Sequence, residues 1–201
     1  MKKFVLPVLF LMLVCSSHAQ HQRATIGIYS TTVSKSKAKT LGFENPYGSY
    51  VRKIYPNSGA AAAGLQAFDY VTGVNDEEVA RHYTISDILS QYQPGDEVKV
   101  SLVRQNKPME MMVRLGDRSN LKFARRTAEE DPFFGISPKH KRLPPGVDGV
   151  PVTIINNSTA QAMGLEDGDI VLTVDGNPVL DWHDIDPAVD NRQVGDPITV
   201  K

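Results

Sequence analysis

The chain has 201 residues, of which 41% are hydrophobic and 22% charged, and its formal net charge is -1. This composition is that of a globular protein and excludes a fibrous or wholly disordered chain. The small net charge gives no support to bulk binding of nucleic acid. The length allows one large domain or two small ones.

The N-terminus has the pattern of a signal peptide over residues 1–19. A basic start precedes an apolar run at residues 4–14, and small residues stand at Ser17 and Ala19. The run is too short to span about 30 Å of hydrocarbon comfortably, so we expect cleavage after Ala19 and not a membrane anchor. The protein is therefore predicted to be periplasmic or secreted.

Cys15 is the only cysteine, and it lies within this segment. Lipidation at Cys15 is the alternative to cleavage, but Val14 is a poor fit for the small residue expected before a lipidated cysteine. After cleavage the chain has no thiol nucleophile, disulfide or cysteine metal site, so its fold depends on hydrophobic cores.

Short strands and helices follow. Residues 50–55, YVRKIY, alternate between the two faces of a predicted strand. Ser58 lies in an Asn-Ser-Gly turn that is similar to the nucleophile turn of trypsin-like serine proteases. It is also a suitable N-cap for a short alanine helix that Gly64 would end. Residues 69–75, DYVTGVN, predict a buried strand that ends in a turn.

The following segments complete a first domain. Thr84 is expected to begin a helix over residues 84–92, with Asp87 three positions on as in a capping box. Two closing strands are predicted at residues 97–104 and 109–115. The charged residues that come next indicate a solvated linker.

The chain contains an internal repeat with an offset of 100 positions. Residues 48–79 align with residues 149–179, without gaps from Val51 and Pro151 onward. The identical pairs include Ile54 and Ile154, Asn57 and Asn157, Ser58 and Ser158, Gly64 and Gly164, and Asp69 and Asp169. Because the Asn-Ser pair recurs at the same place in both copies, Ser58 is interpreted as a helix cap and not as a nucleophile.

Linked motifs occur in the same order in both copies. The first copy has TLGF, VRKI, SGAAAAGL and FDYVTGVND, and the second has FFGI, STAQAMGL and GDIVLTVDG. With these motifs each copy resembles a PDZ domain, in the style of the bacterial PDZ domains attached to HtrA-like envelope proteases. The first copy departs from the family pattern at Phe68 and Asp76, where glycine is usual.

The resemblance implies a mostly β fold with short helices, of the α+β class. We expect two partly open barrels or sandwiches, each capped by two helices. The expected domains are residues 24–116 and residues 121–201, with a charged linker over residues 117–132. The second domain ends early, at the equivalent of Ser101, and is expected to be incomplete at its C-terminus. Residues 135–149 are expected to be an insertion relative to the first copy.

The resemblance also implies that each copy binds protein C-termini. Backbone N–H groups of a glycine loop would bind the terminal carboxylate, and the peptide would add to a strand beside the loop. The loop residues would be Leu41, Gly42 and Phe43 in the first copy and Phe134, Gly135 and Ile136 in the second. The groove residues would be Ile85, Ile88 and Leu89, with Ile185, Ala188 and Val189 at the same positions of the second copy. Periodicity alone assigns these six residues to the core. No histidine aligns with the start of the groove helix, so apolar ligands are expected.

The sequence contains no metal-binding constellation and no nucleophile elbow or phosphate loop. No cofactor, metal or catalytic residue is therefore expected, and the chain is predicted not to be an enzyme. The first functional hypothesis is an exported tandem-PDZ adaptor or scaffold that binds C-terminal or extended peptides by β-strand addition. The alternative is the regulatory, substrate-binding region of a larger envelope protease, or of a partner protease, whose catalytic domain lies outside these residues.

Overall fold

The structure is a computed structural model that describes residues 23–201, apart from residues 124–126, 128, 140–142 and 145. The predicted signal peptide, with Cys15 and the cleavage position after Ala19, lies outside the described residues. The fold is mostly β with short helices, as predicted. In the described part of the chain, no helix is both long enough and apolar enough to cross a membrane.

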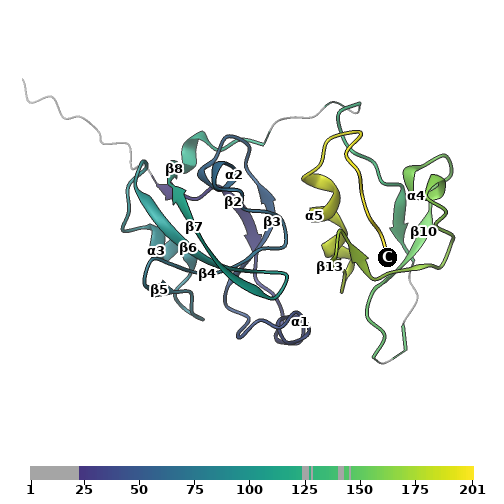
Figure 1. Ribbon diagram of the computed structural model, residues 1–201, viewed down its shortest axis with the longest axis horizontal. Coiled ribbons are helices and arrows are strands. Elements are labelled where there is room, and N and C mark those ends of the chain that lie inside the picture. The colour runs from purple at the N-terminus through teal and green to yellow at the C-terminus, as the bar shows by residue number, and fades with distance from the viewer. Residues whose placement is uncertain (1–22, 124–126, 128, 140–142, 145) are drawn as a thin grey trace, which may run out of the picture.

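The first copy is built on an antiparallel sheet (Figure 1). Its strands, in spatial order, are β2 (Ile28–Thr31), β3 (Ser49–Ile54), β4 (Tyr70–Val74), β6 (Glu97–Arg104) and β7 (Lys107–Arg114). Two shorter pairings complete the copy: β5 (Glu77–Glu78) pairs with β4, and β1 (Ala24–Thr25) pairs with β8 (Gly116–Asp117). The 3-10 turn η1 (Arg118–Asn120) follows β8. β2 is the outer strand on one side of the sheet, and β7 is the outer strand on the other.

Local capping explains the helices α2 (Gly59–Ala63) and α3 (Ile85–Leu89). The Ser58 side chain accepts a hydrogen bond from Ala61 N, and Gly64 ends α2 with a φ of 79°. Thr84 and Asp87 form the predicted capping box of α3. These hydrogen bonds lower the pKa of Asp87, the Thr84 side chain having the larger effect.

A third helix, α1 (Lys35–Thr40), was not predicted, and it changes the alignment of the two copies. Ser34 caps α1, and Ala38 is the buried residue of this helix. With α1 included, the segment from Gly27 to β3 in the first copy is longer than the segment from Gly135 to β10 in the second. The predicted insertion at residues 135–149 is wrong, because the extra residues belong to the first copy.

The second copy repeats the arrangement with shorter elements. Strands β11 (Ile170–Val171), β10 (Val150–Ile154) and β9 (Ile136–Pro138) form one sheet, and β12 (Thr173–Val174) pairs with β13 (Asn177–Pro178). The helical elements are α4 (Thr159–Ala162), the 3-10 turn η2 (Trp182–Asp184) and α5 (Ile185–Asp190).

Equivalent contacts recur at the predicted offset. Val74 pairs with Val100 in the first copy, and Val174 forms a bridge with Val200 in the second. Each copy has its own buried apolar cluster, which contains Val71 and Val74 in the first copy and Val171 and Val174 in the second. The repeat found in the sequence is thus a repeat of three-dimensional contacts.

Candidate functional site

The candidate site of the first copy is a glycine loop between β1 and β2. Gly27 has a φ of 88°, and its carbonyl accepts hydrogen bonds from Tyr55 N at 3.0 Å and from the Ser58 hydroxyl at 3.2 Å. The carbonyl of Ile26 accepts from Ala60 N at 2.7 Å. The start of α2 therefore holds the carbonyl groups of this loop, and Ser58 fixes the loop as well as capping the helix.

The second copy has the same loop at Gly135. Its φ is 87°, and its carbonyl accepts hydrogen bonds from Ile155 N at 2.9 Å and from the Ser158 hydroxyl at 3.4 Å. The carbonyl of Phe134 accepts from Ala160 N at 2.9 Å. These contacts match those of the first copy one by one, so Phe134, Gly135 and Ile136 correspond to Ile26, Gly27 and Ile28.

Only glycine fits at these two positions. A Cβ atom on Gly27 would lie 2.2 Å from the Ser58 Cβ atom, and one on Gly135 would lie 2.0 Å from the Ser158 Cβ atom. Both glycines also have a positive φ, which side chains disfavour. The lack of room for a Cβ atom thus requires glycine at both positions, and the positive φ favours it.

The prediction for Leu41, Gly42 and Phe43 is wrong. Their backbone N–H groups donate to the carbonyls of Lys37, Lys39 and Ala38 respectively, and so satisfy the C-terminal end of α1. Leu41 is buried in a cluster with Tyr50 and Tyr70, and Phe43 stacks on the ring of Tyr70 with 3.9 Å between ring centroids. These three N–H groups bond to backbone carbonyls at the end of α1, so a carboxylate could bind them only if the end of that helix opened.

Each glycine loop leads directly into an outer strand. Ile28, the first residue of β2, pairs with Ile54 of β3, and Ile136, the first residue of β9, pairs with Ile154 of β10. No other described strand pairs with the outer edge of β2 or of β9. The backbone groups along those edges can therefore pair with an added strand.

The helix residues predicted to line a groove are part of the cores. Ile85, Ile88 and Leu89 belong to the first buried cluster, which also contains Ile26. In the second copy Ile185 and Ala188 are buried, and Val189 is partly buried against the same cluster as Ile136. The structure thus brings each glycine loop and its later helix to one shared core, while the binding role of the six helix residues stays a prediction.

Sequence reasoning did not identify Ile26, Gly27 and Ile28 as the glycine loop of the first copy. An available signal was the Gly-Ile pair that both copies share, at Gly27-Ile28 and Gly135-Ile136. The intervening α1 hid this signal, because it shifts the loop by eight positions relative to the offset of the repeat.

The described residues show no other arrangement with evident chemistry. No group of three or more His, Cys, Asp or Glu side chains among them is placed to hold a metal ion. The two histidines near the later helices, His82 and His183, are exposed.

Comparison with known proteins gives one family match and several relatives. Residues 24–115 match the family model described as PDZ domain. The chain is 28% identical over 159 residues to the periplasmic pH-dependent serine endoprotease DegQ of Escherichia coli. This alignment covers 79% of this chain and 35% of DegQ. The chain is 24% identical over 176 residues to the periplasmic serine endoprotease DegP of Salmonella typhimurium, in an alignment that covers 87% of this chain and 36% of DegP.

The chain therefore spans about a third of the length of the curated relatives it matches. Among solved structures, an HtrA-type protease AlgW with a decapeptide superimposes with a TM-score of 0.42 at 20% identity. That match covers 48% of this chain and 30% of AlgW.

Proposed function

We propose that the chain is an exported tandem-PDZ protein that binds C-terminal or extended segments of other proteins. Residues 24–115 match the PDZ domain model, and the relatives DegQ and DegP are periplasmic serine endoproteases. In this proposal residues 121–201 form a second PDZ domain, incomplete at its C-terminus, and the charged residues 117–132 link the two. The protein acts as a non-catalytic adaptor or scaffold in the periplasm or outside the cell.

One observation carries the proposal, namely that two glycine loops with the same contacts each lead into an outer strand. The Gly27 loop precedes β2, and the Gly135 loop precedes β9. In each loop the carbonyls are bonded inward, to the start of α2 or α4. This fixes the loop geometry while the adjoining strand keeps a free edge.

Binding would proceed by strand addition. The peptide backbone pairs with the outer edge of β2 or β9, which supplies affinity that depends little on sequence. The terminal carboxylate would lie at the loop and accept hydrogen bonds from its backbone N–H groups. In the first copy the Gly27 N–H donates to the Thr25 hydroxyl at 3.2 Å, so a carboxylate would replace that hydroxyl as the acceptor.

Side-chain selection would come from apolar residues between strand and helix. The candidate groove residues are Ile85, Ile88 and Leu89 in the first copy, and Ile185, Ala188 and Val189 in the second. Because all six are apolar and neither nearby histidine is placed among them, we expect peptides with apolar C-terminal residues.

A second candidate is favoured by the relatives, which are periplasmic serine proteases. In that case the same two loops belong to the regulatory, substrate-binding region of a larger envelope protease or act beside a partner protease. Catalysis would then come from residues outside this chain.

Binding of immobilised peptides to residues 20–201 tests the proposal. An apolar C-terminal peptide should bind, and amidation of its carboxylate should weaken binding at least tenfold, which corresponds to about 1.4 kcal/mol. An affinity unchanged by amidation would show that the loops do not bind a carboxylate. Cleavage of an unfolded substrate by the purified chain would instead favour an enzyme.

A further inference from the structure

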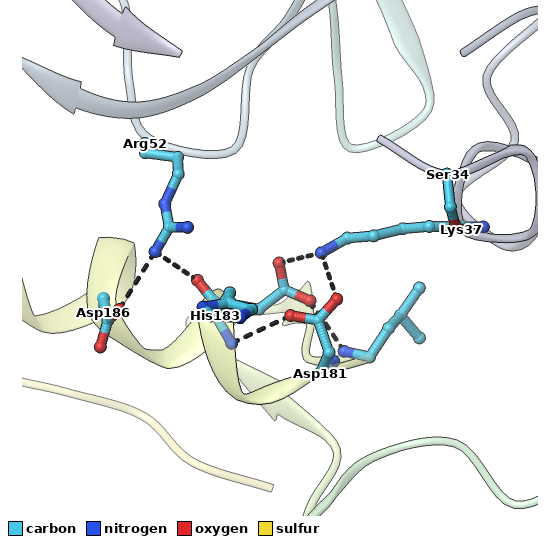
Figure 2. Close-up of polar contacts among 8 residues, drawn as sticks. Ser34, Lys37, Arg52, Asp181, His183 and Asp186 are labelled. Carbon is cyan, nitrogen blue, oxygen red and sulfur yellow. Dashed lines mark hydrogen bonds and ion pairs between the residues drawn. The ribbon is translucent and has the colours of Figure 1, made fainter. Parts of the chain in front are cut away.

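The two copies meet across a surface of opposite charges (Figure 2). Lys37 of α1 lies between two carboxylates of the second copy, with its Nζ 3.0 Å from Asp181 and 2.5 Å from Asp184. Asp184 is only 1% exposed, and its other oxygen accepts from Leu180 N and Asp181 N. Lys37 therefore neutralises a carboxylate that the second copy holds in a fixed position.

Strand β3 continues this surface. Arg52 donates to the carbonyl of His183 at 2.8 Å and to the Asp186 carboxylate at 3.1 Å, as Figure 2 shows. Lys53, the next residue, forms an ion pair with Asp190 at 2.5 Å. Asp186 and Asp190 are four positions apart in α5, so they lie on one face of the helix.

The Asn191 side chain binds the backbone of the same strand. Its amide oxygen accepts from Ile54 N at 3.2 Å, and its amide nitrogen donates to the carbonyl of Arg52 at 2.7 Å. In the second copy the equivalent N–H, that of Ile154, donates to the nearby Asp167. The first copy has Ala67 at that position, so the second copy supplies the acceptor that the first copy lacks.

Apolar side chains also cross the surface in both directions. Phe68 of the first copy packs against the core of the second, and Leu180 of the second packs against the Leu41, Tyr50 and Tyr70 cluster of the first. Phe68 has a φ of 72°, a conformation that is costly for a bulky residue. Gly168 takes its place in the second copy.

The charged side chains of β3 and α5 on this surface have no charged counterpart at the equivalent positions of the other copy. Arg52 and Lys53 correspond to Val152 and Thr153 in the second copy. On the other side, Asp186 and Asp190 correspond to Ser86 and Ser90 in the first copy. The two copies therefore differ at the positions where they meet, and these differences make the two surfaces complementary in charge. A surface that is only in contact with solvent does not require such complementarity.

We propose that these residues form an interdomain clasp. In the clasp, the surface of η2 and α5 in the second copy docks on β3 and α1 of the first copy in the same chain. The clasp consists of Lys37, Arg52, Lys53 and Phe68 with Leu180, Asp181, Asp184, Asp186, Asp190 and Asn191. It holds the two copies in one fixed arrangement and needs no bound peptide. Because several of its contacts are partly exposed ion pairs, salt weakens it.

Energy transfer between two dyes tests the clasp. The mature chain lacks cysteine, so cysteines placed at the exposed residues Ser86 and Met163 carry the dyes. The wild-type chain should show a single transfer efficiency at low salt, and about 1 M NaCl should increase the separated population. Lys53→Glu should increase that population about fivefold, and Lys53→Glu with Asp190→Lys should restore the original value.

Lys99→Glu is the matched control, because Lys99 is about as exposed as Lys53 and forms an ion pair with Glu110 inside the first copy. It should leave the transfer efficiency unchanged. A broad efficiency distribution in the wild-type chain, or no response to Lys53→Glu, would overturn the proposal. Transfer between two separately labelled chains would also overturn it, because the partner would then be a second molecule.

Discussion

Phe68 and Gly168 occupy corresponding positions in the two copies, and both have a positive φ, of 72° and 98°. Such a backbone costs glycine little but costs a bulky residue about 1–2 kcal/mol. Phe68 nevertheless stands here, and its ring reaches the core of the second copy. Packing of Phe68 against Tyr50 of its own copy and against the core of the second copy therefore offsets local backbone strain.

Replacing Phe68 tests that balance. Phe68→Gly should relieve strain in the first copy but remove apolar packing from the second, for a net loss of about 1–3 kcal/mol in the stability of the second copy. Trp182 is the only tryptophan and packs against the core that Phe68 contacts, so its fluorescence reports denaturant unfolding there. Phe68→Leu, which keeps both the strain and an apolar side chain, is the control. A higher unfolding midpoint for the glycine variant would mean that strain outweighs the contact.

Elements set by local chemistry could be predicted from the sequence. Ser58 and Gly64 bound α2 as expected, and Thr84 with Asp87 begins α3, because caps act through residues only a few positions apart. The repeat predicted which residues of the two copies correspond, and the Val74–Val100 and Val174–Val200 pairs lie at that offset of 100 positions.

Two features depended on information that the local pattern does not contain. The glycine loop of the first copy was misplaced, because α1 separates Gly27 from β3 and the Leu-Gly-Phe stretch at residues 41–43 ends that helix. The clasp arises from residues more than a hundred positions apart, such as Lys37 and Asp184. Phe68 was noted only as a departure from the family pattern, although that departure marks the interface.

Gly27 should be far less tolerant of substitution than Gly64, although both have a positive φ. Gly27→Ala adds a Cβ that would meet Ser58 at 2.2 Å, whereas a Cβ on Gly64 meets nothing within 4 Å. We expect Gly64→Ala to cost about 1 kcal/mol from strain alone and Gly27→Ala to cost several times more. Urea unfolding measures both. Equal losses would show that the loop can move away from Ser58.

Asp69 and Arg104 form an ion pair at the edge of the first core. Asp69 is fully buried, and Arg104 donates to its two oxygens at 2.6 and 2.7 Å, which raises the pKa of Arg104. Arg104→Met leaves the carboxylate without this partner and should cost about 3–5 kcal/mol of unfolding free energy.

The equivalent Asp169 is exposed and supplies the matched control. Asp169→Asn should change stability by less than about 1 kcal/mol. The double variant Asp69→Asn with Arg104→Met should recover part of the loss, because no charge remains buried. A double variant as unstable as the single one would assign the loss to packing of the arginine side chain.

Tyr50 should make the protein less stable at alkaline pH. Burial raises the pKa of Tyr50 above its ordinary value of 10.0, and the carboxylates of Asp184 and Asp181 across the clasp raise it further. Above about pH 10 the unfolded chain releases this phenolic proton while the native chain keeps it. Stability should therefore be unaffected below pH 10 and fall at higher pH, by up to about 1.4 kcal/mol per pH unit for this residue.

Denaturant unfolding from about pH 8 to pH 11 measures this slope, with the ordinary tyrosine pKa near the middle of the range. Tyr50→Phe should make the slope shallower by about one proton. Some slope should remain, because burial also raises the pKa of Tyr70 despite the hydrogen bond from Gly48 N to its hydroxyl. Asp181→Asn should reduce the contribution of Tyr50 without abolishing it, since burial is the larger cause. If Tyr50→Phe leaves the slope unchanged, the Tyr50 hydroxyl ionises in the native protein as readily as in the unfolded chain.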